Sequence, residues 1–317
     1  MKKIYFLIIC IFIISCSNQQ QNLDYDSGTT GIVANFEDKL DHTIYEGQDL
    51  SLVVNLQNKG SYDEAYGRVI LSGFDRHIMP FRELVAYDNY AVHYLPELES
   101  RSPYNIDGGF DTVSFEIPKN SIYLSDFEKY EPNLMLSLCY YYETKATPNV
   151  CISLDPFNSK SKICDPFKPI VMQNQGAPVA VTRVEQEVMA DFTTFIVTVE
   201  NVGEGNVITP TQESADACPL NLKHDDLNEF EFEMKLSNTQ NPECTPNGRA
   251  RLVNGKAVIF CKFQLRPEFT KNHNEEIGAE MYTKQLEINI KYFYNTNTYK
   301  KLKLAKQPGT YQNTNID

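Results

Sequence analysis

The feature that most constrains the fold is a pattern that occurs twice, in the same order, along the 317 residues. Residues 52–60 alternate between apolar and polar and end in Asn58-Lys59-Gly60, and residues 195–203 do the same and end in Asn201-Val202-Gly203. Later, residues 134–144 and 286–296 each lead into Tyr-x-Tyr-x-Thr. The two offsets are 143 and 152 residues. A single match is what any two β-strands show, but two matches in the same order predict tandem homologous units.

Period-2 alternation predicts β-structure through the body of the chain. It is clearest at residues 113–117, 230–236 and 286–294. The expected fold is all-β, with two tandem antiparallel immunoglobulin-like β-sandwiches at residues 31–165 and 176–306. Residues 166–175 lie in a stretch rich in Pro, Gly and Gln, which predicts a linker, and residues 307–317 are expected to be a disordered tail.

The N-terminus reads as an export signal. Lys2 and Lys3 precede an apolar run at residues 4–14, which is too short to span a bilayer as a helix and is followed by Ser15-Cys16. This arrangement resembles the lipobox of prokaryotic lipoproteins. It implies a signal peptide at residues 1–15, lipid on Cys16, and a membrane partner reached through that lipid. Residues 16–30 are expected to form a flexible tether. The alternative is a plain signal peptide or an uncleaved anchor with a chance cysteine.

The alternating strand that ends in Asn-x-Gly and leads through a turn into another strand resembles CARDB-type immunoglobulin-like domains of prokaryotic surface proteins. Residues 138–144, 150–152 and 102–110 are also similar to uncharacterised secreted proteins of small-genome archaea. The resemblance covers most of residues 45–305. It implies an immunoglobulin-like fold and an envelope location, and it brings no catalytic residue.

Six cysteines follow Cys16, and an even number in an exported chain indicates disulfides. Six cysteines allow 15 connectivities. A hairpin folded about Lys145 predicts a Cys139–Cys151 bond, and neither cysteine has a counterpart in the second copy of the repeat. A second hairpin that turns at Asn254-Gly255 brings Cys244 near Cys261, although that pair needs a bent approach. Cys164 and Cys218 then remain as the third pair.

The charge and the motifs argue against several functions. A formal charge of −13 argues against nucleic acid, because binding phosphates needs clustered Lys and Arg. The sequence contains no CxxC, HExxH, GxSxG or P-loop, so no metal site, cofactor or catalytic residue is assigned. His224-Asp225-Asp226 is the best acidic cluster, but a solvated loop explains it. Residues 107–111 offer oxygens for Ca²⁺, yet Asp-Gly is first of all turn chemistry.

A binding surface is expected on residues 74–105, which show little strand alternation. Arg82, Tyr87 and Tyr90 carry this hypothesis, because Arg and Tyr are enriched at protein interfaces. The competing interpretation is that the aromatic residues of this stretch cap one end of a sandwich.

Together these observations predict a non-enzymatic lipoprotein of the cell envelope, exported and membrane-anchored. It would act as a surface binding, adhesion or structural module with an envelope or surface protein as its partner. The alternative is an envelope hydrolase, glycosidase-like, built from scattered carboxylates.

Overall fold

The computed structural model describes residues 26–37, 42–85, 88–153, 163–189, 192–236, 241–264 and 281–307. The expected signal peptide at residues 1–15, Cys16, most of the expected tether, Tyr87 and residues 308–317 lie outside them. The all-β prediction is confirmed, because strands make up 53% and helices 4% of the structure and the sheets are mainly antiparallel.

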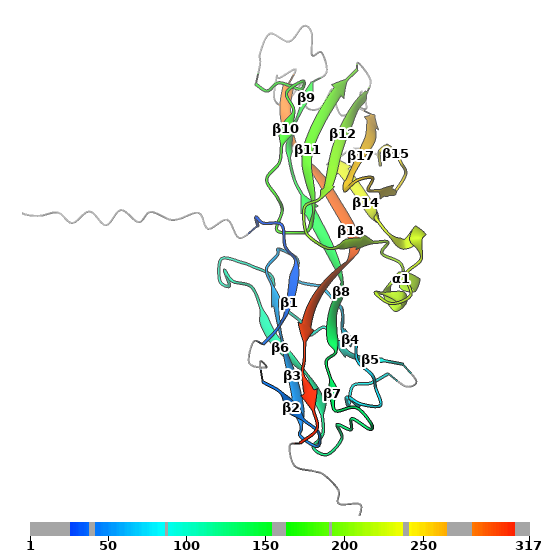
Figure 1. Ribbon diagram of the computed structural model, residues 1–317. Helices are drawn as coiled ribbons and strands as arrows, with labels where there is room; N and C mark the ends of the chain where they lie inside the picture. The colour runs from blue at the N-terminus through cyan, green and yellow to red at the C-terminus, as the bar shows by residue number, and fades with distance from the viewer. Residues whose placement is uncertain are drawn as a thin grey trace, which may run out of the picture.

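One large sheet runs through the whole molecule, and its two longest strands lie side by side along its length (Figure 1). They are β8 (Asn133–Ala146) and β18 (Met281–Lys301), whose register joins residues 133–146 to residues 288–301. The order across the sheet is β16 (Arg249–Arg251), β14 (Glu229–Leu236), β18, β8, β4 (Gly67–Ser72) and β5 (Tyr90–Tyr94). Two further strands pair with β18, namely β9 (Asn149–Ser153) and β13 (Asn206–Ile208).

Two smaller sheets pack on this large one and define two lobes. The first lobe carries β1 (Ile32–Phe36), β3 (Leu50–Asn58) and β6 (Phe110–Ile117), in that order. The second lobe carries β10 (Ile170–Val171), β11 (Val179–Val188), β12 (Phe192–Asn201), β17 (Lys256–Gln264) and β15 (Glu243–Thr245). At the far end of the first lobe, β19 (Leu304–Ala305) pairs with β2 (Ile44–Tyr45) and β7 (Lys129–Tyr130).

Each long strand begins in one lobe and ends in the other. Near the end of β8, the Thr144 hydroxyl donates to the Val179 carbonyl of β11 at 2.6 Å. Near the end of β18, the Thr298 hydroxyl donates to the Ala34 carbonyl of β1 at 3.3 Å. Each lobe therefore contains strands from both sides of residues 166–175. The division into two domains at that segment stays a prediction, and the structure shows that the halves share one sheet.

The register of β8 and β18 gives the repeat a local two-fold axis. Tyr141 pairs with Phe293, and these two residues lie 152 positions apart, which is the offset of the sequence repeat. A residue that pairs with its own repeat equivalent lies on such an axis. Rotation about this axis relates β1, β3 and β6 to β11, β12 and β17. It also relates β4, which pairs with β8, to β13 and β14, which pair with β18.

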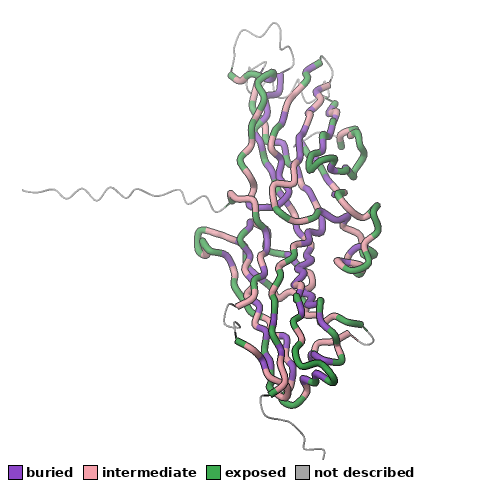
Figure 2. Tube along the Cα trace, viewed as in Figure 1, coloured by how far each residue is buried: buried purple, intermediate pink, exposed green. Residues whose placement is uncertain are grey.

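The core runs without interruption through both lobes, as the buried residues in Figure 2 show. At its centre lie four tyrosines with at most 2% of their surface exposed: Tyr140, Tyr142, Tyr292 and Tyr294. Neighbouring rings meet edge to face, for example Tyr140 and Tyr142 at 5.7 Å between centroids. Their aromatic area thus contributes to the hydrophobic core where the two lobes join.

An insertion between β13 and β14 packs against the first lobe. It contains α1 (Gln212–Ala217), which Thr211 caps by accepting from the Ser214 amide, and the 3-10 turn η1 (His224–Asp226). Arg68 of β4 donates to the carbonyl of Ala215 in α1. None of the helices in the described residues is long and apolar enough to cross a membrane.

All six cysteines after Cys16 form disulfides, and one of the three expected pairs is correct. Cys244 and Cys261 face each other in the register of β15 and β17, with Cα atoms 4.1 Å apart. The turn at Asn254-Gly255 is also present, with positive φ at both residues.

The other two expected pairs, Cys139–Cys151 and Cys164–Cys218, are wrong. Cys139 bonds to Cys218, at a Cα distance of 6.2 Å, and Cys151 bonds to Cys164, at 5.7 Å. The reason is that β9 does not fold back on β8. Both strands pair with successive parts of β18, so the chain continues in one direction past residue 146. Twelve residues of extended chain at ~3.3 Å each would place Cys139 and Cys151 up to about 40 Å apart.

Candidate binding groove

The Asn-x-Gly loops of the repeat adopt matching hydrogen-bonded structures. The Asn58 Oδ1 accepts from the Gly60 amide at 3.1 Å, and the Asn201 Oδ1 accepts from the Gly203 amide at 3.3 Å. Each of these Oδ1 atoms also accepts from a tyrosine hydroxyl. Tyr142 donates to Asn58 at 3.4 Å, and Tyr294 donates to Asn201 at 3.0 Å. Sequence-equivalent tyrosines of β8 and β18 thus hold equivalent loops.

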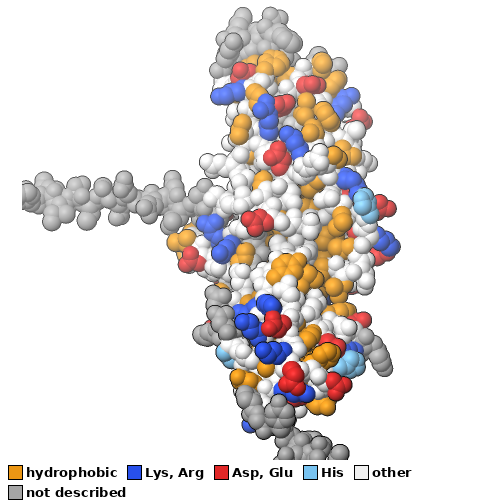
Figure 3. All heavy atoms as spheres, in the orientation of Figure 1, with side chains coloured by type: hydrophobic (Ala, Val, Ile, Leu, Met, Phe, Trp, Pro, Cys, Tyr) orange, Lys and Arg blue, Asp and Glu red, His pale blue; other side chains and the backbone are white. Residues whose placement is uncertain are grey.

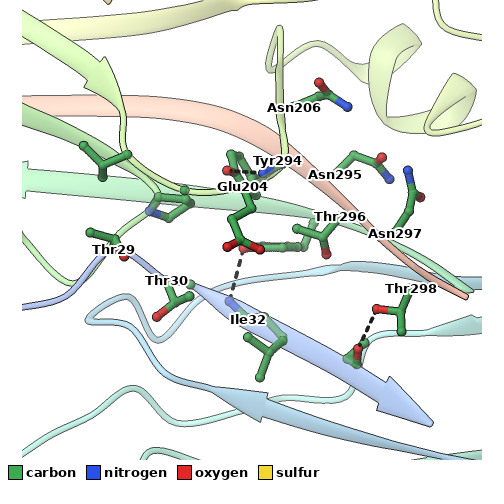
Figure 4. Close-up of a pocket in the computed structure, with 18 of the residues that line it drawn as sticks. Thr29, Thr30, Ile32, Glu204, Asn206, Tyr294, Asn295, Thr296, Asn297 and Thr298 are labelled. Atoms are coloured by element: carbon green, nitrogen blue, oxygen red, sulfur yellow. Dashed lines mark hydrogen bonds between the residues drawn. The ribbon is translucent and has the colours of Figure 1, made fainter. Parts of the chain in front are cut away.

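The second of these loops forms one wall of a groove between the lobes (Figure 4). Its volume is about 450 Å³, within the range of ligand sites. The other walls are the start of β1 and the later part of β18. The lining residues are Thr29 to Asn35, Tyr140, Pro178, Val202 to Asn206, and Tyr294 to Thr298.

The lining of the groove is largely uncharged and mixes polar with apolar surface. Its polar side chains are mostly hydroxyls and amides, including Thr30, Asn206, Thr296 and Asn297 (Figure 4). Glu204 is the one charged residue among those that line it. In Figure 3 the surface at the junction of the lobes carries few charged side chains, and hydrophobic side chains gather on one side of it. Such a lining suits a neutral ligand that offers hydrogen-bond donors and acceptors.

Two tyrosines of the groove are held neutral. Burial raises the pKa of Tyr294 to about 12, and it raises the pKa of Tyr140 well above its usual value of 10. Their hydroxyls also have structural partners. Tyr140 accepts from the Ile32 amide at 3.2 Å, and Tyr294 accepts from the Gly205 amide at 2.7 Å. Both phenols therefore brace the walls at neutral pH and are poorly suited to act as general bases.

A smaller cavity of about 180 Å³ lies at the pseudo-symmetric position, beside the first Asn-x-Gly loop. It is lined by residues 61–64, Glu143 and Lys145. The Tyr141 hydroxyl donates to the Glu143 carboxylate at 2.5 Å. Burial first, and then the Glu143 charge, raise the pKa of Tyr141. This cavity is acidic where the groove is neutral.

The segment expected to bind a partner is divided between core and surface. Phe74, Ile78, Met79 and Phe81 are buried, which agrees with the capping interpretation for this part of it. Arg82 is exposed and forms an ion pair with Glu116 at 3.0 Å.

Tyr90 opens β5 opposite Ser72 and is half-buried, and Tyr87 lies outside the described residues. Neither Arg82 nor Tyr90 contributes to the groove. The binding role of all three residues stays a prediction.

The two acidic motifs, at residues 224–226 and 107–111, lie at turns. His224 is 94% exposed in η1, and Asp226 caps that turn by accepting from the Lys223 amide at 2.8 Å. Gly108 has φ +77°, and the Asp111 carboxylate accepts from the neighbouring Thr112 amide. Within the described ranges no group of three or more His, Cys, Asp or Glu residues is arranged to hold a metal ion.

Reasoning from the sequence missed the groove. Most of its residues lie in three segments, 29–35, 202–206 and 294–298, which the pairing of β8 with β18 brings together. The one signal that pointed there was the repeat, because the Asn-x-Gly loop and the Tyr-x-Tyr strand both belong to it.

Comparison with known proteins gives no further constraint, since no protein-family model and no curated protein matches this chain. The resemblance to CARDB-type domains therefore stays a prediction.

Proposed function

We propose that this chain is a non-enzymatic lipoprotein of the cell envelope, exported and held on the membrane by lipid on Cys16, and that it binds a protein partner. The observation that carries the binding role is the groove of about 450 Å³ between the lobes. Its walls are fixed by the paired loops and by buried tyrosine hydroxyls, so it is a preformed site on a rigid scaffold.

Two features support the location. Disulfides persist mainly outside the reducing cytoplasm, and the fold contains three of them. The lipobox-like residues at the end of the N-terminal apolar run supply the anchor in this proposal. Two acyl chains hold a protein on a membrane far more firmly than one.

The hydrolase alternative is less well supported. A glycosidase site needs two carboxylates facing each other across a cavity, roughly 5–10 Å apart. Among the described residues that line the groove there is one carboxylate, that of Glu204. The tyrosines beside it have raised pKa values and stay protonated.

The anchoring is tested by fractionation of cells that express the full chain. The wild type should partition with membranes, and its mature N-terminus should be a lipidated Cys16 by mass spectrometry. Cys16→Ser should leave the protein unlipidated. Cys10→Ser, which changes a cysteine inside the apolar run, is the matched control and should behave like the wild type. An unmodified Cys16 in the mature protein would overturn the anchor.

A further inference from the structure

Two strands present unpaired edges beside the groove. Along β18, even-numbered residues direct their backbone groups toward β8, as the bond from the Leu302 amide to the Pro132 carbonyl shows. Odd-numbered residues therefore face the opposite edge. There β13 covers β18 only as far as Asn295, opposite Asn206. In the described part of the chain, no residue pairs with the outward backbone groups of Asn297 and Tyr299.

The facing edge belongs to β1, which pairs with β3 on one side. The Lys59 amide donates to the Gly31 carbonyl, so odd-numbered residues of β1 face β3 and even-numbered ones face outward. Two of the outward groups are bound by side chains. The Ile32 amide donates to Tyr140, and the Ala34 carbonyl accepts from Thr298. The two strand edges thus border the groove from opposite walls.

The other half of the repeat shows what occupies the position next to an Asn-x-Gly loop. Ser61 and Glu204 are equivalent, because each directly follows the Gly of an Asn-x-Gly loop. The Ser61 amide donates to the Gly176 carbonyl at 2.9 Å, and its hydroxyl donates to the Gln175 carbonyl at 2.6 Å. Gln175 and Gly176 of this chain therefore fill the position next to the first loop.

At the groove the corresponding segment is directed elsewhere. Ile32 and Val179 are equivalent, since their amides donate to the equivalent tyrosines Tyr140 and Tyr292. Three residues earlier, Thr29 stands where Gly176 stands in the second lobe. The chain before Thr29 is drawn toward Arg101, which donates to the Ser27 carbonyl at 3.0 Å. In the described structure the Glu204 amide, unlike that of Ser61, has no acceptor.

We propose that the groove binds an extended, uncharged segment of a partner polypeptide, which adds to the edge of β18 at Asn297 and Tyr299 and offers a carbonyl to the Glu204 amide. This is strand addition, in which main-chain hydrogen bonds supply affinity and side-chain pockets supply selectivity. Apart from Glu204 the lining is uncharged, and this disfavours acidic segments in particular, because burying an unpaired charge is costly. The inference specifies the partner chemistry of the proposed binding function and rests on it.

The test uses a peptide with the sequence of residues 170–178, because Gln175 and Gly176 of that segment occupy the equivalent position in the other half. The labelled peptide is titrated into the full-length protein in detergent, and hydrogen exchange of the protein is followed. Saturable binding with slowed exchange at residues 297–301 and 203–206 is expected. The same peptide with alternate amides N-methylated should not bind.

Three variants locate the binding. Asn297→Pro removes the outward amide of the strand without touching a ladder bond to β8, and Asn297→Ala is its matched control that keeps this amide. The Pro variant should bind about fivefold more weakly than the Ala variant, as expected for one hydrogen bond. Thr30→Phe fills the groove from an exposed position and should abolish binding with an unchanged melting temperature, which keeps the test valid if the Pro variant does not fold.

The proposal is overturned if the peptide does not bind at millimolar concentration, or if Thr30→Phe binds it as the wild type does. Saturable binding of a neutral oligosaccharide such as cellohexaose, without peptide binding, would overturn it in favour of a glycan site. None of these results depends on the lipid. A chain without lipid on Cys16 that still binds the peptide would refute the anchor and retain the groove.

Discussion

The repeat provides two equivalent asparagines in different surroundings, and their replacement by alanine should cost different amounts of stability. Asn58 is fully buried. Its Nδ2 donates to the Tyr62 carbonyl at 2.8 Å and to the Leu98 carbonyl at 3.1 Å, and its Oδ1 accepts from the Gly60 amide. Asn201 is half-buried beside the groove.

The expected magnitudes follow from these bonds. A buried hydrogen bond contributes about 1 kcal/mol net, so the loss of the three short bonds of Asn58 predicts a decrease in the free energy of unfolding of about 3 kcal/mol for Asn58→Ala. Asn201 also makes three bonds, a donor bond to the Gly205 carbonyl at 2.9 Å and acceptor bonds from the Gly203 amide at 3.3 Å and the Tyr294 hydroxyl at 3.0 Å. Their loss costs less, because water in the groove can reach the groups that the removal of this half-buried side chain exposes. We therefore expect about 1.5 kcal/mol for Asn201→Ala.

The assay is urea denaturation of the oxidised protein, followed by circular dichroism, with both variants and the wild type under the same conditions. Asn55→Ala is the control, because Asn55 lies on the same strand, is half-buried and makes no side-chain hydrogen bond in the described structure. It should lie within about 0.5 kcal/mol of the wild type. If Asn201→Ala costs as much as Asn58→Ala, burial does not set the difference and the reasoning is refuted.

Three further predictions follow from the same structure. Because β8 and β18 serve both lobes, calorimetry should show one cooperative transition, and two separate transitions would contradict the shared sheet. Loop entropy predicts that loss of the Cys139–Cys218 bond, at a separation of 79, costs about 4.5 kcal/mol, against about 3 kcal/mol for Cys151–Cys164 at 13. Urea midpoints of the paired Ala variants test this order, and peptide mapping without reductant tests the pairing. Burial raises the pKa of Tyr294 to about 12. Its contribution to the free energy of unfolding is therefore complete below pH 10, and it is lost as the pH rises toward 12, at about 1.4 kcal/mol per pH unit. Midpoints at pH 9, 10 and 11 should fall more steeply for the wild type than for Tyr294→Phe, and equal slopes would count against the burial of this phenol.

Local patterns predicted the strands well, because alternation records which face of a strand is buried. Residues 230–236, expected from their period-2 pattern, form most of β14 with the even-numbered positions inward. The turn at Asn254-Gly255 was also predictable, since few residues other than Gly and Asn tolerate positive φ. The Cys244–Cys261 pair was expected around that turn, but β16 just before the turn pairs with β14, and the bond forms through the pairing of β15 with β17.

The Cys139–Cys151 prediction failed because it assumed that neighbours in sequence are neighbours in space, and the Cys164–Cys218 pair, obtained by elimination, failed with it. The Cys139–Cys151 pair required β9 to fold back on β8. In the structure β18 extends past the end of β8 and pairs with β9 as well, so β9 continues in the direction of β8. The sequence of residues 139–151 contains no information about that distant partner, which lies more than a hundred residues further along.

The sequence by itself determined the all-β class, the repeat, the turn chemistry and the residue types at each core position, because these depend on side-chain period and backbone conformation over a few residues. Only the tertiary structure decided that β8 and β18 pair about a local two-fold axis and that each of them begins in one lobe and ends in the other. That pairing fixes two of the three disulfides, buries the tyrosines and leaves the groove beside the open edge of β18. Its physical cause is the match between two long strands with the same apolar period, and such a match is a property of both segments together.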